Sequence, residues 1–278
     1  MTELSTHQAV ADDGTTIVGR VDGQGPPLVI VPALPSDGEL EWGPVLAFLR
    51  DRFTCFVMDR GSRAKNAGSR DLSLERLVGD VVTFTDGVGE PVGLLGGSWS
   101  GMLALGAVRS TSMVRALAVW EPTVNEAASD NDRAHAAQTL GHVGRLVDED
   151  RLVEAAKYWQ AASGIMSEAE LAAIPDEYYE ASAPTFAIQF EEYRQAAKPG
   201  GPTTTEPSKL ATIDVPVLLL HGAESVPWFV DGVHHVADHV PDATVHAIAG
   251  VGHTGGVTAP APVADELTRF FTATLDAA

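Results

Sequence analysis

Cysteine and basic residues are scarce in this sequence. Cys55 is its one cysteine, which excludes an intramolecular disulfide. It lies in an apolar run, FTCFVM, and we expect it to be a buried core thiol. The 18 lysines and arginines are outnumbered by 38 aspartates and glutamates, which leaves a net charge of -20. Nucleic acids and anionic membranes bind concentrated Lys and Arg, so we expect neither as a partner.

Long apolar runs are also missing. No stretch approaches the roughly 18 apolar residues of a membrane-spanning helix. The first residues lack a basic segment followed by an apolar one, so we predict no signal peptide and a cytoplasmic location. The 278 residues, 45% hydrophobic and 20% charged, are enough for a globular protein with a substantial core. The sequence leaves open whether the chain forms a homo-oligomer.

Short apolar runs recur along both ends of the chain and are separated by helical patterns. Continuous apolar strands of this kind are typical of a parallel sheet covered on both faces. One run alternates in polarity, as a half-exposed strand does. The predicted strands are Thr15–Val21, Pro27–Pro32, Phe53–Met58, Pro91–Gly96, Val114–Trp120, Val215–Gly222 and Ala243–Gly250; the predicted helices cover Ser73–Val88, the residues after Ser98, and Pro262–Leu275.

Strand signals vanish between Trp120 and Val215, where the composition and the apolar spacing are helical. A loop rich in Pro, Gly and Thr then returns the chain to the sheet. We therefore predict an α/β core formed by residues 1–124 and 208–278, with a helical cap at residues 125–207.

The stretch GLLGGSWSGMLAL contains a candidate nucleophile. A buried strand ends in Gly96 and Gly97, and a helical pattern begins at Ser98. This is the context of the G-x-S-x-G elbow, a sharp strand-to-helix turn that exposes a catalytic serine. The last glycine of the motif is replaced by Ser100, with Gly101 next. Serine is small enough to meet the steric requirement there, so we identify Ser98 as the candidate nucleophile.

At this point the chain resembles the α/β-hydrolase superfamily over nearly its whole length, apart from the helical insertion. The order and spacing of six segments agree with the family: LVIVPALPSDG, VMDRGSR, LLGGSWSG, LAVWEPTV, VLLLHGAESVPW and IAGVGHTGG. The resemblance implies an α/β-hydrolase fold, with a mostly parallel central sheet flanked by helices and a helical cap inserted after the sixth strand. It implies hydrolase chemistry only broadly, because the superfamily hosts many reactions.

The resemblance assigns the general base to His253, in the glycine-rich loop GVGHTGG before the last helix. His221, at a strand end, is interpreted as packing or hydrogen-bonding locally. His235 and His239 are one helical turn apart, but no H-E-x-x-H motif or further ligand accompanies them. We therefore predict no metal site and no cofactor.

The acid is where the sequence departs from the family. Most members carry an Asp at the position that holds Ser225 here, and Glu224 is one residue early. The alternative is Glu121, at the end of the sixth strand. Haloalkane dehalogenases and zearalenone-type lactonases carry their acid there, and the chain resembles the lactonases in its VIVPALPSDGE and AVWEPTVN segments. We favour Glu121, with Glu224 as the rival.

The oxyanion hole is expected to use two backbone amides. One belongs to Trp99, after the nucleophile, and the other to Leu34, in the loop where the family often has His-Gly but this chain has Pro32 and Ala33. The Asp59-Arg60 turn is interpreted as structural.

These residues predict a serine hydrolase that cleaves an ester or lactone of a largely apolar small molecule. A serine nucleophile argues against dehalogenase and epoxide-hydrolase mechanisms, which need a carboxylate. Two alternatives stay open: a C–C bond hydrolase or biosynthetic cyclase or lyase, and a non-catalytic ligand-binding protein on the same fold.

Overall fold

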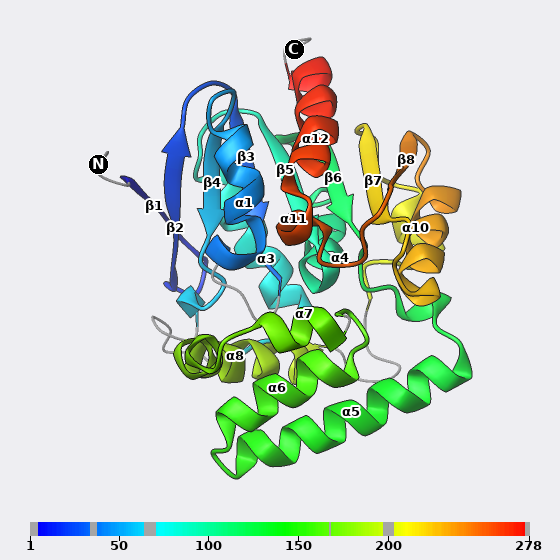
Figure 1. Ribbon diagram of the computed structural model, residues 1–278. Helices are drawn as coiled ribbons and strands as arrows, with labels where there is room; N and C mark the ends of the chain where they lie inside the picture. The colour runs from blue at the N-terminus through cyan, green and yellow to red at the C-terminus, as the bar shows by residue number, and fades with distance from the viewer. Residues whose placement is uncertain (1–4, 34–37, 64–70, 167, 197–202, 276–278) are drawn as a thin grey trace.

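The central element of the fold is a twisted sheet. The computed structural model describes residues 5–33, 38–63, 71–166, 168–196 and 203–275. Their strands form one eight-stranded sheet in the order β1-β2-β4-β3-β5-β6-β7-β8 (Figure 1). The strands are β1 (Ser5–Val10), β2 (Thr16–Gly23), β3 (Pro27–Val31), β4 (Thr54–Met58), β5 (Val92–Gly97), β6 (Val114–Trp120), β7 (Val217–Gly222) and β8 (Ala243–Ile248). From β4 to β8 in this order, all neighbouring strands pair in parallel. Strand β2 pairs antiparallel with both of its neighbours, β1 and β4. The predicted fold class is confirmed.

All seven predicted strands are present within a few residues of their expected ends. Strand β1, which pairs with β2 at the edge of the sheet, is absent from the predicted strands. Its residues STHQAV are mostly exposed, so no apolar run marks it. Such an edge strand is held by backbone pairing to one neighbour, which leaves little trace in the sequence.

Helices cover both faces of the sheet and create two apolar cores. One face is covered by α1 (Glu39–Leu49) and α12 (Pro260–Leu275), with the short α11 (Gly255–Thr258) beside α1. The other face is covered by α3 (Leu74–Asp86), α4 (Ser98–Ala107) and α10 (Pro227–His239). The predicted helices at Ser73–Val88 and Pro262–Leu275 correspond to α3 and α12. Because both faces are covered, strands β3 and β5 to β7 are buried almost throughout.

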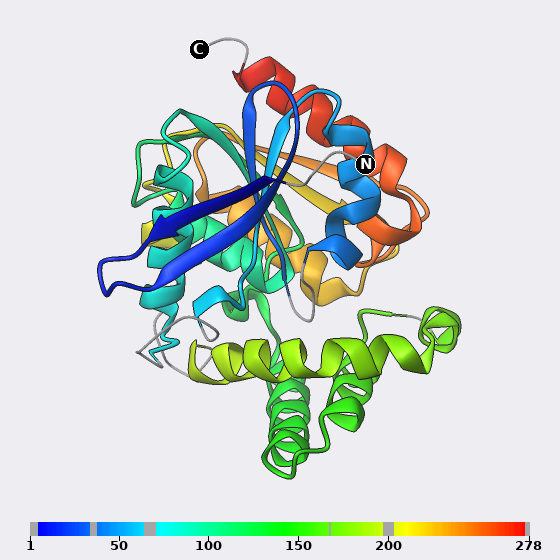
Figure 2. The same ribbon diagram turned by 90° about the vertical axis from the view of Figure 1, so that its left-hand side faces the viewer.

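A group of helices separates β6 from β7, where the sequence predicted helical structure. It begins with a 3-10 turn, Asn125–Ala127, and continues with α5 (Asp130–Asp148), α6 (Leu152–Ala162), α7 (Glu168–Ala173) and α8 (Asp176–Ala196). We call residues 125–196 the helical insertion. It has its own apolar core, which includes Val143, Phe186 and Phe190. Figures 1 and 2 show that it lies across the ends of the parallel strands, and a short helix, α9 (Pro207–Leu210), follows it.

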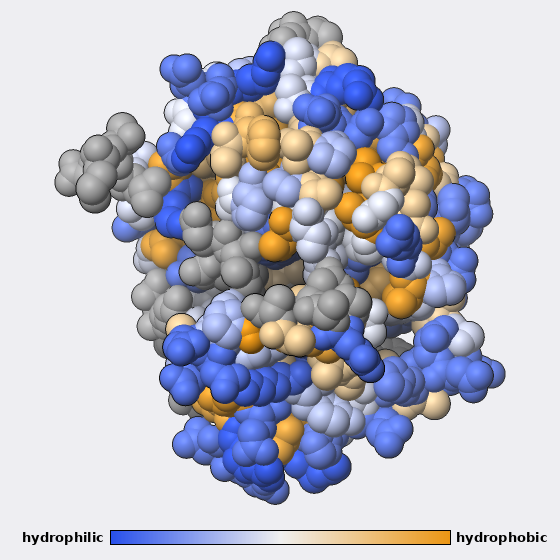
Figure 3. Space-filling model, in the orientation of Figure 1, coloured by the Kyte–Doolittle hydropathy of each residue, from blue (hydrophilic) through white to orange (hydrophobic). Residues whose placement is uncertain are grey.

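The surface of the molecule is largely polar in the view of Figure 3, especially over the helical insertion. The same view shows a hollow where the insertion meets the sheet-bearing part of the chain. Among the described helices, none combines the length and the apolar character needed to cross a membrane.

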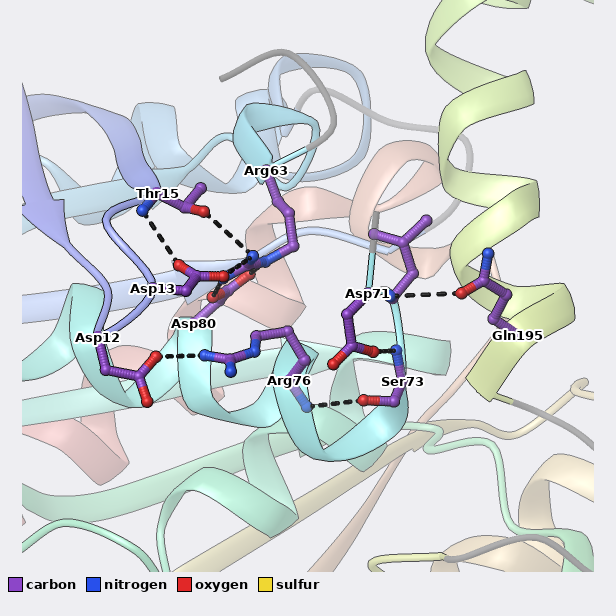
Figure 4. Close-up of polar contacts among 10 residues, drawn as sticks. Asp12, Asp13, Thr15, Arg63, Asp71, Ser73, Arg76, Asp80 and Gln195 are labelled. Atoms are coloured by element: carbon purple, nitrogen blue, oxygen red, sulfur yellow. Dashed lines mark hydrogen bonds and ion pairs between the residues drawn. The ribbon is translucent and has the colours of Figure 1, made fainter. Parts of the chain in front are cut away.

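A buried arginine ties the β1–β2 turn to helix α3 (Figure 4). The Arg63 guanidinium donates to both carboxylate oxygens of Asp80 at 2.5 Å and to Asp13 at 2.6 Å. The Arg63 side chain is 1% exposed and that of Asp80 is 4% exposed. Burial raises the pKa of Asp80, and the Arg63 hydrogen bonds and charge oppose that shift. A charge buried in this way depends on its partner, because it has no access to water.

Asp80→Ala is therefore expected to reduce the free energy of unfolding by up to about 3–5 kcal/mol, since it removes two hydrogen bonds of the buried Arg63 and leaves Asp13 as its remaining carboxylate partner. The matched control is Asp12→Ala, which removes the partner of Arg76 at a carboxylate that is 82% exposed. That change should cost less than about 1 kcal/mol. Urea unfolding of both variants measures the difference, and equal losses would contradict the structural role of Arg63.

Candidate active site

The candidate nucleophile lies on a sharp turn between a strand and a helix. Strand β5 ends at Gly97, and α4 begins with Ser98. Ser98 has a φ of 50°, a left-handed conformation that costs free energy for a residue with a side chain. A Cβ on Gly96 would lie 2.7 Å from the Ser100 carbonyl oxygen, and one on Gly101 would lie 2.8 Å from Val119. The elbow therefore needs glycine at these two positions.

Glu121 emerges from the sheet next to Ser98. Gly97 of β5 and Trp120 of β6 are paired in register, so the residue that follows each of them leaves the same edge of the sheet. Glu121 has a φ of 40°, and its side chain is fully buried. Two strained residues side by side indicate a rigidly held geometry.

The Glu121 carboxylate joins three segments that are far apart in the sequence. One oxygen, Oε1, accepts from the Gly222 N–H at 2.7 Å and from the Ser225 hydroxyl. The other, Oε2, lies 2.5 Å from Nδ1 of His253. Since an ionised carboxylate only accepts hydrogen bonds, this contact places the proton of a neutral imidazole on Nδ1 and leaves Nε2 unprotonated.

His253 is held on three sides. Its ring stacks on Phe229, with centroids 3.9 Å apart and planes at 16°. Its carbonyl oxygen accepts from the Trp120 indole at 2.9 Å. The side chain is 10% exposed. These contacts fix the loop between β8 and α11 and orient the imidazole toward Glu121.

The rival residues lie elsewhere. The Glu224 side chain is exposed, and its backbone N–H donates to the Val251 carbonyl. His221 contacts its own neighbour, the Gly222 carbonyl, at 2.9 Å. His235 contacts the Thr205 carbonyl and His239 the His235 carbonyl. Within the part of the chain that the structure describes, no three metal-ligating side chains gather.

Of the two predicted oxyanion donors, the structure describes Trp99 but not Leu34. Trp99 is the second residue of α4, where backbone N–H groups lack a helical acceptor. Its ring is buried and packs on Tyr193 of α8, 4.6 Å between centroids. Leu34 lies outside the described residues. The Ala33 N–H donates to Glu41 Oε2 at 2.6 Å, so it is already occupied.

Comparison with known proteins identifies the family. Residues 28–266 match the model of the alpha/beta hydrolase family, and this range includes Ser98, Glu121 and His253. The chain belongs to the alpha/beta hydrolase family. A search of curated proteins found no match.

Solved structures with the same fold cover nearly the whole chain of this hydrolase. An alpha/beta hydrolase from Sphaerobacter thermophilus DSM 20745 is 25% identical, with 95% of this chain and 99% of that chain covered and a TM-score of 0.74. Naproxen esterase from Bacillus subtilis is 18% identical, with 97% and 92% covered and a TM-score of 0.67. The epoxide hydrolase CorEH is 19% identical, with 98% and 99% covered and a TM-score of 0.71.

Two acidic residues of this alpha/beta hydrolase, Glu41 and Glu192, interact with Arg60 and are not marked by any signal in the sequence. Burial raises the pKa of the Glu41 carboxyl to about 7, opposed by the Ala33 N–H and the charge of Arg60. Arg60 is 4% exposed and pairs with the buried Glu192 of α8. Burial also raises the pKa of Glu192, opposed by the same arginine. No motif marks either contact, because each depends on residues brought together only by the fold.

Proposed function

We propose that this alpha/beta hydrolase is a serine hydrolase acting on an ester or lactone through an acyl-enzyme. Ser98 is the nucleophile, His253 the general base and Glu121 the acid that orients it. The observation that carries the proposal is the 2.5 Å contact between His253 Nδ1 and Glu121 Oε2, at the strand edge where Ser98 occupies its strained elbow. Nucleophile, base and orienting acid are the three groups that acyl transfer requires.

In the proposed reaction these three residues act in turn. His253 Nε2 takes the Ser98 hydroxyl proton while Oγ attacks the carbonyl carbon. The carbonyl oxygen becomes an oxyanion, which the Trp99 N–H and the predicted Leu34 N–H stabilise. His253 then donates its proton to the leaving alkoxide, which departs as an alcohol or, from a lactone, as the hydroxyl end of the acyl chain. Water, activated by His253, hydrolyses the acyl-enzyme and restores Ser98.

The residue at the elbow distinguishes between the activities found on this fold. Structural neighbours include both an esterase and an epoxide hydrolase, so the fold alone does not select a reaction. Opening an epoxide through an alkyl-enzyme ester needs a carboxylate nucleophile, whereas Ser98 supplies a hydroxyl that forms an acyl ester. Esters and lactones share this acyl-enzyme route, and both belong to the proposed substrate class.

The helical insertion makes up most of the proposed cap, residues 125–207. Tyr193 of α8 packs on Trp99 and on Trp159 of α6, so aromatic side chains join the insertion to the residue that follows the nucleophile. Trp99 and Tyr193 are buried in this contact, and the proposed substrate keeps the largely apolar body expected from the sequence. The proposed partner is a small molecule rather than a polymer.

Labelling with a fluorophosphonate tests the proposal, because the probe phosphonylates only an activated serine. We expect wild-type protein to be labelled at Ser98, and Ser98→Ala to remain unlabelled. Ser110→Ala is the matched control. Ser110 lies beyond the end of α4, and its hydroxyl donates to the Gly106 carbonyl. This variant should be labelled like the wild type. Folded wild-type protein that resists the probe would refute the serine hydrolase.

A substrate panel then separates the two classes. Aryl esters of increasing acyl length and lactones of increasing ring size are compared by kcat/KM, with Ser98→Ala as the blank.

A further inference from the structure

The peptide group between Pro32 and Ala33 is held from both sides. Its carbonyl oxygen accepts from the Ser100 hydroxyl and from Arg60 Nη1 at 3.3 Å. Its N–H donates to Glu41 Oε2 at 2.6 Å. Arg60 Nη1 also donates to Ser100 Oγ at 3.1 Å. One peptide group therefore contacts a cation and a hydroxyl at its oxygen and a carboxyl at its nitrogen.

The groups that hold this peptide come from separate parts of the fold, and Ser100 and Arg60 are buried whereas Glu41 is partly buried. Ser100 belongs to α4, two residues after the nucleophile, and is fully buried. Glu41 belongs to α1, and Arg60 follows β4. Arg60 is anchored in turn by Glu192 of the helical insertion, whose side chain is fully buried. The insertion is thus connected through one ion pair to the chain that leaves β3.

The charges select one orientation of the peptide. A peptide group is planar and carries a dipole, with its oxygen and its N–H on opposite sides. If the plane rotated by half a turn, the oxygen would approach the Glu41 carboxyl and the N–H would approach the Arg60 guanidinium. The N–H against the Arg60 guanidinium is unfavourable, and so is the oxygen against the Glu41 carboxylate once Glu41 is ionised, above its raised pKa of about 7. The observed orientation is the one that both charges favour.

This orientation bears on catalysis because the peptide precedes the predicted oxyanion donor. The Ala33 N–H already donates to Glu41, so we do not assign it as a donor to the oxyanion. The next amide along the chain is that of Leu34, the predicted donor. Oxyanion donors act only if they are fixed before the charge develops, and the family's usual His-Gly support is replaced here by Pro32 and Ala33.

We propose that Ser100, Arg60 and Glu41 are positioning residues that fix the Pro32–Ala33 peptide, which directly precedes the predicted second oxyanion donor in the sequence. The proposal rests on the serine hydrolase proposed above. It gives Ser100 a task that glycine, at the last position of the G-x-S-x-G motif, would not perform.

The first test is Ser100→Ala, measured on an aryl ester. We expect kcat to fall about 10- to 100-fold, less than the loss on deleting a whole oxyanion donor, because Arg60 still contacts the carbonyl. KM should stay within about threefold, since the oxyanion exists only in the transition state. Affinity for an aryl boronic acid, whose tetrahedral adduct with Ser98 places an oxygen in the hole, should fall in proportion to kcat.

Ser110→Ala serves again as the control and should change none of these quantities. A Ser100→Ala protein that is folded by circular dichroism and keeps kcat within threefold of the wild type would overturn the proposal, as would a loss confined to thermal stability.

A second pair of variants at Glu41 keeps the proposal testable if Ser100→Ala fails to fold. Glu41→Gln retains an oxygen that accepts from the Ala33 N–H, whereas Glu41→Ala removes the acceptor. We expect kcat to fall at least tenfold more in Glu41→Ala than in Glu41→Gln, with boronate affinity following. Equal kcat in the two variants would overturn the role of Glu41.

The fluorophosphonate experiment separates this proposal from the one it rests on. Unlabelled wild-type protein removes the serine hydrolase and the positioning role together. Labelled wild-type protein whose Ser100→Ala and Glu41→Ala variants match it in kcat and boronate affinity removes only the positioning role.

Discussion

Replacing Glu121 with glutamine is expected to lower kcat by about three to four orders of magnitude. The glutamine oxygen can still accept from the Gly222 N–H and the Ser225 hydroxyl, which now contact Glu121 Oε1. Its NH2 group then faces His253 Nδ1, which must act as an acceptor. A neutral His253 would carry its proton on Nε2 and could no longer take one from Ser98. The variant loses the correct tautomer while the volume of the side chain is preserved.

The matched control is Glu224→Gln, at the rival glutamate. The Glu224 side chain is exposed, so this change should leave kcat within about threefold of the wild type. Steady-state kinetics on one aryl ester, with circular dichroism to verify folding, compares the two variants. The opposite ranking would assign the acid to Glu224 and would require the loop after β7 to rearrange in solution.

Local patterns in the sequence were sufficient to predict the sheet and the elbow. Buried parallel strands read as continuous apolar runs, and β5 followed at once by α4 reproduces the strand-to-helix context of Ser98. Both signals depend on neighbouring residues only. Strand β1 escaped because an exposed edge strand needs no apolar run. The predicted boundaries of the cap, and the catalytic roles of Ser98, His253 and Glu121, stay predictions.

The environment of Glu121 could be anticipated only in part. The sequence placed Ser225 where most family members carry an acid, which pointed to an acid elsewhere. It gave no sign that the Ser225 hydroxyl donates to Glu121, 104 residues away in the chain. The exposure of Glu224 likewise depends on how the loop after β7 leaves the sheet. Contacts of this kind are set by the three-dimensional packing of strands, and a linear pattern does not encode them.

The contacts around Ser100 show the same limit. From the sequence, Ser100 needed only to be small, and Arg60 was interpreted as structural. In the fold, Ser100 contacts both Arg60 and the Pro32 carbonyl, and Arg60 pairs with Glu192, 132 residues further along. Ser100 is fully buried, and Gly101 is the position where an added Cβ would lie 2.8 Å from Val119.

Replacing His253 with alanine is expected to reduce kcat by about a millionfold, because Ser98 loses the group that accepts its proton. Trp99 and the rest of the oxyanion hole remain, so hydrolysis somewhat above the uncatalysed rate should persist. The fluorophosphonate should label the variant far more slowly than the wild type. A loss of less than tenfold would contradict the role of His253 as the base.

His246→Ala is the matched control. His246 Nδ1 also lies 2.7 Å from a glutamate oxygen, Oε2 of Glu266, but the His246 side chain is 40% exposed. Its kcat should equal that of the wild type.

Added imidazole distinguishes a missing base in His253→Ala from a collapsed site. In the wild type the His253 ring lies between Phe229, with ring centroids 3.9 Å apart, and Glu121 Oε2, 2.5 Å from Nδ1. Deleting the ring leaves a space between these two side chains. If those two side chains hold their places, free imidazole should bind there and restore part of the lost rate. Rescue in His253→Ala but not in His253→Ala/Glu121→Gln would show that the carboxylate acts through the imidazole.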